Sequence, residues 1–261
     1  MIYFKKLEKL AHTTKKFELM EKNLFLNFSL KYKIFYKIYL YYNLYIRNLK
    51  YYFRNSYSQL NEDIFLKECF KNKKKGFFVD IGCHHPFRNS NTFLLYKSGW
   101  SGINIDLNKL SIDLFNIARP RDINICSAIS NFEGTIDYYL PNDNPLSSEI
   151  TINENFSKIL KDHHGNQYKA LKTKSTTWSS IQKKYEDFLK NIDFLKIDIE
   201  GSDFQVLKTI DLEKLKIKIL MIEASSLDKI SREEIINYLK LKDYKILLDN
   251  NLNVIFENNS Y

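Results

Sequence analysis

Phe77-Phe-Val-Asp-Ile-Gly82 is a short apolar segment that breaks on an acid and a glycine, and the polar cluster Cys83-His-His-Pro86 follows it. The pattern predicts a buried parallel strand that ends in an Asp-x-Gly turn, where an α/β sheet binds a nucleotide-like ligand. Asp80 can bind a cation or a hydroxyl group, and Gly82 lets the backbone approach a ligand closely. The two residues are therefore predicted to form the floor of a ligand site.

The turn differs from a phosphate-binding loop. It contains neither G-x-x-x-x-G-K-[ST] nor G-x-G-x-x-G, and its single glycine does not provide the run of free backbone N–H groups that cradles phosphates. An acid beside the turn would also repel a pyrophosphate. The site suits a ligand with a cationic or hydroxylated centre, such as S-adenosylmethionine, better than NAD or ATP. An ordinary strand-to-helix turn is the alternative interpretation.

Alternating strands and helices follow this turn. The second predicted strand ends in Asp106, 26 residues after Asp80, which is roughly the spacing at which nucleotide sites place the carboxylate that holds the ribose hydroxyls. The third predicted strand ends at Ser127 and Ala128, where a base could be held. The predicted elements are a helix over residues 91–98, a strand over 102–106, a helix over 108–118 and a strand over 123–129. This order predicts half of a doubly wound sheet.

The second half of the chain repeats the alternation with more acids. Asp198 and Glu223 each end a short apolar strand, and Ser202 and Asp203 are predicted caps of the helix between these strands. The predicted elements are a strand up to residue 198, a helix over 202–210, a strand over 219–223, a helix over 231–242, and a hairpin of strands 244–248 and 254–257. Parallel strands followed by a terminal antiparallel hairpin indicate the methyltransferase form of the nucleotide-binding sheet.

Four ordered motifs resemble the FkbM family of S-adenosylmethionine-dependent methyltransferases. They are Val79-Asp-Ile-Gly-Cys-His-His-Pro-Phe-Arg-Asn-Ser-Asn-Thr92, Gly99-Trp-Ser-Gly-Ile-Asn-Ile-Asp106, Arg119-Pro-Arg-Asp-Ile-Asn124 and Phe194-Leu-Lys-Ile-Asp-Ile-Glu-Gly201. The similarity extends from about Tyr57 to about Ser225. It implies a Rossmann-like class I methyltransferase fold of the α/β class, S-adenosyl-L-methionine as cofactor, and methyl transfer to a hydroxyl group, often on a sugar of a natural product or a surface glycan.

The predicted cofactor residues follow from the strand ends and from this resemblance. Gln59 lies in a segment that resembles the family's segment before the first strand, and we expect it to lie over the cofactor. Three residues open the first crossover helix, where free N–H groups can bind the cofactor carboxylate, although helix capping alone would also explain them. The full set is Gln59, Asp80, Gly82, Ser90, Asn91, Thr92, Asp106, Asn108, Ser127 and Ala128.

The predicted catalytic residues are Asp198, Glu200 and His85. Asp198 and Glu223 end strands that should be neighbours, and the arrangement resembles that of metal-dependent O-methyltransferases, so we predict a divalent metal (Mg, Mn or Fe) with Asp198, Glu223 and His85 as ligands. A histidine ligand would favour iron, manganese or zinc over magnesium. Without a metal, His85 or Glu200 would serve as the base. Alternatively, one of His84 and His85 binds the turn and the other touches substrate or solvent.

The excess of positive charge lies in the N-terminal segment. Residues 1–76 carry 17 basic and 6 acidic side chains, a balance of +11, and the remaining residues carry 23 and 25, a balance of −2. We therefore divide the chain into a basic, aromatic-rich helical extension over residues 1–56 and a methyltransferase domain over 57–261. The extension has no uncharged apolar run near the roughly 18 residues that a membrane-spanning helix needs, and it lacks the pattern of a signal peptide.

Three roles remain open for the extension. It packs on the catalytic domain or on a second copy in a homo-oligomer, it anchors the protein to anionic lipid, or it contacts nucleic acid. Nucleic acid is the weakest of these because the chain has no recognised nucleic-acid module. Cys69, Cys83 and Cys126 form no C-x-x-C pair, so neither a disulfide framework nor a zinc knuckle is indicated. We expect a cytoplasmic protein, in peripheral contact with the inner membrane face if the extension binds lipid.

The expected acceptor is a sugar, on a nucleotide-activated sugar or on a surface glycan such as capsule or lipopolysaccharide. Residues 141–174 are the least regular part of the domain and are a candidate acceptor lid. Within them, His163 and His164 are expected to be exposed turn residues, with acceptor contact as the alternative. The rival interpretation of the whole chain is a non-catalytic Rossmann-like binding or scaffold protein that its basic segment recruits to a membrane. Acids at several strand ends favour the enzyme.

Overall fold

The computed structural model describes residues 32–142, 144, 147–224 and 229–260. The chain divides into two compact units between Phe53 and Arg54, three residues before the boundary that the sequence analysis placed after Ser56. The second unit, Arg54–Tyr261, contains the central sheet.

The described part of the N-terminal unit is helical. It consists of α2 (Lys33–Tyr42), the π-helical turn η1 (Asn43–Arg47) and the 3₁₀ turn η2 (Leu49–Phe53). No Gly, Pro, Asp or Glu interrupts residues 32–53, which favours continuous helix. Among the described residues, no helix is both long enough and apolar enough to cross a bilayer.

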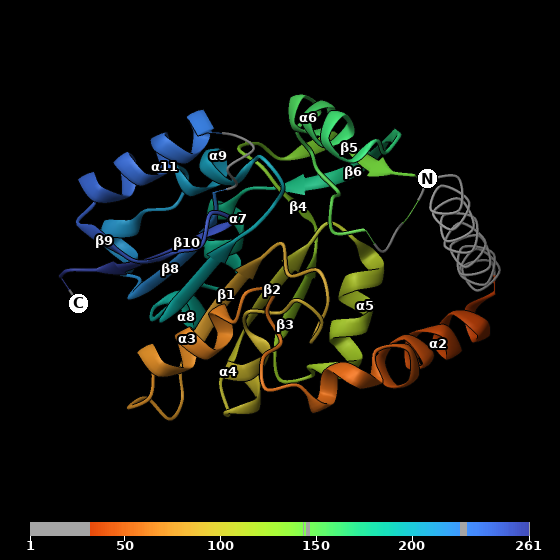
Figure 1. The fold of residues 1–261 in the computed structure, drawn as a ribbon, viewed down its shortest axis with the longest axis horizontal. Helices are drawn as coiled ribbons and strands as arrows, with labels where there is room; N and C mark the ends of the chain where they lie inside the picture. Colours follow the sequence, from red (N-terminus) through yellow and green to blue (C-terminus); the bar gives the residue numbers. More distant parts are fainter. Residues whose placement is uncertain (1–31, 143, 145–146, 225–228, 261) are drawn as a thin grey trace, which may run out of the picture. The chain divides into compact units, whose positions relative to one another are not determined.

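A seven-stranded sheet forms the centre of the second unit (Figure 1). Its order is β3-β2-β1-β7-β8-β10-β9, and only the pairs that include β10 are antiparallel. The strands are β1 (Phe77–Ile81), β2 (Ser101–Asp106), β3 (Ile123–Cys126), β7 (Phe194–Ile197), β8 (Ile219–Glu223), β9 (Tyr244–Asp249) and β10 (Asn253–Asn258). The predicted Rossmann-like methyltransferase fold, with its C-terminal antiparallel hairpin, is confirmed. Strand order reverses beside β1, which places a ligand crevice at the carboxyl ends of β1, β2, β7 and β8.

Helices cover both faces of this sheet. Asn108 and Thr177 begin α5 and α7 with side chains that accept hydrogen bonds from the backbone N–H groups of Leu110 and Ser180. The helices are α3 (Glu62–Cys69), α4 (Phe93–Lys97), α5 (Lys109–Ala118), α7 (Trp178–Lys184), α8 (Glu186–Leu189), α9 (Asp203–Leu207), α10 (Leu212–Leu215) and α11 (Lys229–Leu241).

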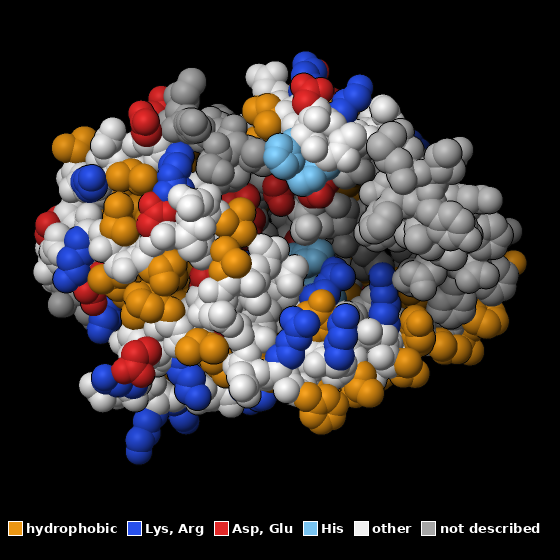
Figure 2. Space-filling model, in the orientation of Figure 1, with side chains coloured by type: hydrophobic (Ala, Val, Ile, Leu, Met, Phe, Trp, Pro, Cys, Tyr) orange, Lys and Arg blue, Asp and Glu red, His pale blue; other side chains and the backbone are white. Residues whose placement is uncertain are grey.

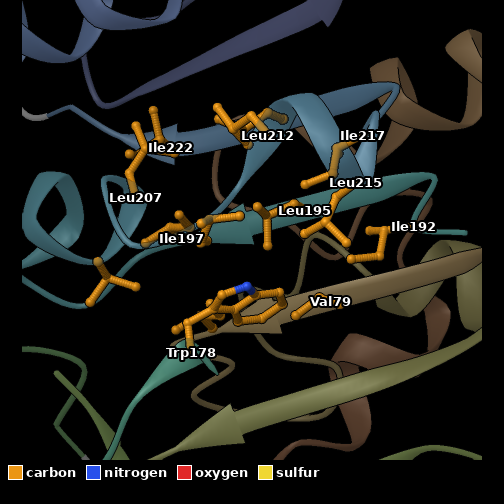
Figure 3. Close-up of a cluster of buried hydrophobic side chains, with 14 of the residues drawn as sticks. Val79, Trp178, Ile192, Leu195, Ile197, Leu207, Leu212, Leu215, Ile217 and Ile222 are labelled. Atoms are coloured by element: carbon orange, nitrogen blue, oxygen red, sulfur yellow. The ribbon is translucent and has the colours of Figure 1, made fainter. Parts of the chain in front are cut away.

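The main apolar core lies between the sheet and the helices α7, α8, α9, α10 and α11. Figure 3 shows side chains of β1, β7 and β8 meeting those of α7, α9 and α10, with the indole of Trp178 among them. Val79, Leu195 and Ile222 are fully buried, and each such side chain contributes about 1.5–3 kcal/mol relative to exposure. This packing fixes the strands whose ends carry the acids.

Two local predictions were wrong. Residues 123–129 form two strands. Strand β3 ends at Cys126 beside Asp106, and the chain then leaves the central sheet as β4 (Ala128–Ile129), which pairs with Ser175 and Thr176 in the second sheet. Ser202 precedes α9 without a side-chain capping bond. The Asp203 carboxylate binds the turn instead, and accepts from the N–H groups of Ile199 and Gly201.

The predicted irregular segment contains regular structure. Residues 141–174 contain α6 (Glu154–His164) and most of β6 (Tyr168–Thr176), and β5 (Gly134–Pro141) comes directly before them. Strands β4, β6 and β5 make a separate three-stranded sheet. In Figure 1, these elements lie on the opposite side of the unit from α3 and α4. His163 and His164 are exposed, as expected, but they lie in the last turn of α6 and not in a loop. We call residues 134–176 the insert.

Candidate functional site

A pocket of about 350 Å³ opens at the carboxyl ends of the central strands. Figure 2 shows the hollow, with acidic and histidine side chains at its walls. Segments from the whole length of the second unit line the pocket, from Gln59 before the sheet to Asn253 in the hairpin. The insert lines one side of the pocket through Glu149, Phe156 and His164. The volume is within the range of small-molecule sites.

Asp106, at the end of β2, organises one end of the pocket. Its two carboxylate oxygens accept hydrogen bonds from the backbone N–H groups of His84 (2.8 Å) and Asn108 (2.7 Å). Burial raises the pKa of Asp106 to about 6. Ser127 and Ala128 line the same pocket. The structure thus brings together four of the predicted cofactor residues.

This end of the pocket fits the adenosine part of S-adenosylmethionine. A carboxylate has about four acceptor positions, so two backbone bonds leave Asp106 able to accept from ribose hydroxyls. Ile105, Leu107 and Ile129 supply apolar surface to the pocket that contains it, as an adenine ring requires. Polar and apolar groups therefore match the two halves of a nucleoside.

Gly82 is required for a reason other than the predicted one. It has a φ of +82°, and a Cβ atom there would lie 1.7 Å from the Asp198 carbonyl oxygen. The glycine therefore admits the loop after β7, which crosses directly over the Asp-x-Gly turn. Gly82 also lines the pocket, so its place in the predicted site is kept.

Asp80 lies behind the pocket wall and does not line it. It accepts a hydrogen bond from the Thr92 hydroxyl (2.8 Å) and pairs with the Lys196 ammonium at 3.3 Å. Ser90 is likewise buried, and its Oγ accepts from the N–H of Phe93. Asp80, Ser90 and Thr92 thus support the wall, and the prediction that each contacts cofactor is not supported by their positions.

Asn91 and Gln59 do line the pocket, as does Asn108. The Asn108 side chain also caps α5 through the N–H of Leu110 at 3.0 Å. Of the three predicted residues at the start of the first crossover helix, Asn91 alone is part of the pocket wall. Seven of the ten predicted cofactor residues therefore line this pocket. They are Gln59, Gly82, Asn91, Asp106, Asn108, Ser127 and Ala128.

His85 is turned away from the pocket. It is 2% exposed, its Nδ1 accepts from the backbone N–H groups of Phe87 (3.3 Å) and Arg88 (3.1 Å), and its ring packs edge-on against Phe87. The prediction of His85 as base and metal ligand is therefore corrected, because its Nδ1 lone pair binds the turn. Within the described residues, it is not part of the carboxylate group that could hold an ion.

His84 lines the pocket in its place. Its Nε2 lies 2.9 Å from Nη2 of Arg88, and because a guanidinium only donates, Nε2 accepts and the ring proton is on Nδ1. Burial lowers the pKa of His84 to about 3, with help from the neighbouring charges of Arg88 and Lys196. His84 is therefore a neutral imidazole and not a general base. The backbone of His84 has a φ of +55°, in the left-handed region that residues with side chains rarely adopt.

Three carboxylates gather at the other end of the pocket. Asp198, Glu200 and Glu223 each place an oxygen within 4.8 Å of the others, and all three are half-buried. Burial, followed by the charges of the neighbouring acids, raises the pKa values of Glu200 and Glu223 well above the usual range. Such a cluster favours either shared protons or a bound cation.

Lys196 is the residue that sequence analysis missed. Its side chain is 5% exposed, and its ammonium lies 3.0 Å from Asp198 and 3.3 Å from Asp80 and donates to the Gly82 carbonyl (3.1 Å). Burial alone would lower the pKa of Lys196, but the two carboxylates raise it. A lysine inside the apolar run of β7 was the available signal, since lysine is almost never buried without a partner.

Comparison with known proteins agrees with this geometry. The family model described as the methyltransferase FkbM domain matches residues 80–246, which include Asp106, the insert and all three carboxylates. No curated protein matches the chain. Because the match covers more than half of the 261 residues, the chain belongs to the FkbM family of methyltransferases.

Proposed function

We propose that this protein is an S-adenosylmethionine-dependent O-methyltransferase that methylates a sugar hydroxyl. S-adenosylmethionine is the usual cofactor of methyltransferases. The observation that carries the proposal is that one pocket is lined by Asp106, at the end of β2, and by the Asp198, Glu200 and Glu223 cluster, at the ends of β7 and β8. The acceptor we propose is a nucleotide-activated sugar or a glycan of capsule or lipopolysaccharide type.

In this proposal, residues at one end of the pocket bind the cofactor and residues at the other end act on the acceptor hydroxyl. When bound, S-adenosylmethionine supplies a methyl group already activated by its sulfonium, so the C–O bond forms as the C–S bond breaks. Asp106 holds the ribose, and the pocket walls align the acceptor oxygen with the methyl group. Glu200 accepts the proton that the hydroxyl loses. Glu200 lines the pocket beside Asp198 and Glu223, where a base that acts on the acceptor hydroxyl would have to lie.

We propose that the same cluster holds a divalent cation. Three carboxylates offer only oxygen ligands, which suit magnesium or manganese better than iron or zinc. The cation would offset the repulsion among the acids and would lower the pKa of a hydroxyl beside it. A carboxylate has two oxygens, so Glu200 can offer one to the cation and keep the other for the acceptor proton.

Calorimetry with S-adenosylmethionine separates the enzyme from the scaffold alternative. We expect the purified protein to bind the cofactor in a single-site isotherm, and we expect elemental analysis to find magnesium or manganese that a chelator removes. Absence of cofactor binding by folded protein would overturn the proposal and favour the scaffold. Full methylation activity after complete chelation would show that the reaction needs no metal, and would overturn that part of the proposal.

The affinity for S-adenosylmethionine is expected to depend on pH through Asp106. Its pKa near 6 means that the carboxylate form, which accepts from ribose, is lost as pH falls through 6. Affinity should be about tenfold weaker at pH 5 than at pH 7.5. Titration calorimetry at both pH values checks this. In the Asp106→Asn variant, S-adenosylmethionine binding should be weak at both pH values. If the wild-type protein binds S-adenosylmethionine equally well at the two pH values, the role of Asp106 is contradicted.

We also propose that residues 32–53 bring the enzyme to an anionic lipid surface. Between residues 22 and 61 the sequence has seven Lys and Arg side chains and no Asp or Glu. Exposed apolar and aromatic side chains lie among these charges, as membrane interfaces favour. They are Tyr32, Ile34, Phe35, Ile38, Tyr41, Tyr42, Tyr45, Ile46, Leu49 and Phe53.

Vesicle co-sedimentation tests the lipid contact. The protein should bind vesicles that contain phosphatidylglycerol, should not bind pure phosphatidylcholine, and should dissociate as salt rises. Replacing both Ile34 and Ile46, which are 70% and 67% exposed, with Ser should abolish binding, and the control Phe188→Ser, at a residue 54% exposed in the catalytic unit, should not. If the double variant instead dissociates a homodimer and the wild type ignores vesicles, the surface is a dimer interface and the proposal fails.

A further inference from the structure

Glu200 and Gly201 form a turn with unusual backbone geometry. Their φ angles are +55° and +88°, so two consecutive residues adopt the left-handed conformation that residues with side chains rarely adopt. Such a conformation persists only where the surrounding structure holds it. The position of the Glu200 carboxylate therefore depends on the contacts that this turn makes.

The insert binds this turn through both of its carbonyl groups. The Thr151 hydroxyl donates to the Glu200 carbonyl at 2.5 Å, and the Asn153 side-chain amide donates to the Gly201 carbonyl at 2.7 Å. From the other side, the Asp203 carboxylate accepts from the Gly201 N–H at 3.0 Å. The turn is thus held on its N–H side by the helix that follows it and on its carbonyl side by the insert.

The two donors are themselves held in place. Thr151 is completely buried and exchanges backbone hydrogen bonds with Tyr139 of β5, and its hydroxyl accepts from the Asn153 N–H at 2.9 Å. The Asn153 side chain also caps α6 by accepting from the N–H of Phe156. The ring of Phe156 lies where a Cβ atom on Gly201 would be, at 2.4 Å. The start of α6 and the turn therefore form one packed unit.

From these contacts we infer that Thr151 and Asn153 are positioning residues that set the Glu200 carboxylate against Asp198 and Glu223. The inference rests on the proposed role of Glu200 at the cation and the acceptor. The same insert lines the pocket through Glu149, Phe156 and His164. One element therefore forms a wall of the acceptor space and fixes the side chain that acts on the acceptor.

Thr151→Val keeps the shape of the side chain and removes its hydroxyl, and Thr151→Ser keeps the hydroxyl. We expect Thr151→Val to weaken Mn²⁺ binding, measured by electron paramagnetic resonance, by about 10- to 100-fold, as loss of a group that orients a metal ligand does. S-adenosylmethionine affinity should stay within about twofold, because Asp106 lies at the other end of the pocket. Thr151→Ser should restore Mn²⁺ binding. The control is Ser157→Ala, which removes a buried hydroxyl of α6 that bonds to Glu154 and not to the turn.

Hydrogen exchange supplies a readout that does not need the metal. Exchange of the backbone N–H groups in residues 199–207 should rise in Thr151→Val and stay unchanged in Ser157→Ala. If folded Thr151→Val keeps wild-type exchange there, or binds Mn²⁺ as tightly as wild type, the positioning role is overturned. If wild type binds no Mn²⁺ while Thr151→Val shows the increased exchange, the metal part of the proposed function fails and the control of the turn by Thr151 stands.

Discussion

The Asp198→Asn variant is expected to lose Mn²⁺ binding and, with the cation, to lose methyl transfer by about 10²- to 10⁴-fold in kcat, because proton transfer to Glu200 depends on the cation that Asp198 helps to hold. Asp198 shares the pocket end with Glu200 and Glu223, and asparagine keeps its shape while removing the charge that a cation needs. S-adenosylmethionine should still bind. Mn²⁺ titration, cofactor calorimetry and turnover with the identified acceptor measure the three effects.

Glu186→Gln is the matched control, because it removes one carboxylate from an exposed position on α8. It should leave cation binding, cofactor binding and turnover at wild-type values. If Asp198→Asn binds Mn²⁺ with wild-type affinity, the cation is held elsewhere. If it also turns over normally, the acidic cluster has no part in catalysis.

The Lys196→Met variant is expected to be destabilised by about 3–5 kcal/mol, the usual result of removing one partner of a buried ion pair. Asp80 is 1% exposed, and loss of the ammonium would leave its charge without its cationic partner; Asp198 and the Gly82 carbonyl would lose contacts as well. Urea unfolding followed by circular dichroism gives the free energy of unfolding. A loss below about 1 kcal/mol would show that Lys196 does not compensate the charge of Asp80.

Lys190→Met tests whether burial causes this effect. Lys190 makes a comparable contact with Asp187 at 2.6 Å, but both side chains are exposed. Water screens such a pair, so we expect no measurable change in unfolding. Equal destabilisation by the two substitutions would mean that burial does not explain the role of Lys196.

The central sheet and the acids at the carboxyl ends of its strands could be predicted from sequence because their signals are local. Each buried parallel strand is a short apolar run, and the acid that ends it marks the ligand edge. Asp106, Asp198 and Glu223 were located in this way, and the pocket contains all three. The turn after β1 was also located, although the sequence does not show that Gly82 makes room for the Asp198 carbonyl.

The rest depends on contacts between distant segments. Within the insert, the sequence predicts a strand over residues 168–173, which is part of β6, but it does not predict β5 or α6. Strand β5 is largely exposed or half-buried, and its partner β6 lies beyond α6 in the chain. Which of His84 and His85 faces the pocket depends on the left-handed backbone of His84, which no local pattern signals. The bond from Thr151 to Glu200 joins residues 49 positions apart. Such pairings are decided by tertiary packing.

Mass spectrometry of acceptors incubated with the protein, S-adenosylmethionine and Mn²⁺ tests the central claim most directly. The panel contains nucleotide sugars and capsule or lipopolysaccharide oligosaccharides. We predict that an acceptor gains one methyl group on a hydroxyl oxygen of a sugar, and that Asp198→Asn greatly reduces this product. A methyl group found on nitrogen or carbon, or a product formed equally well by Asp198→Asn, would contradict the account.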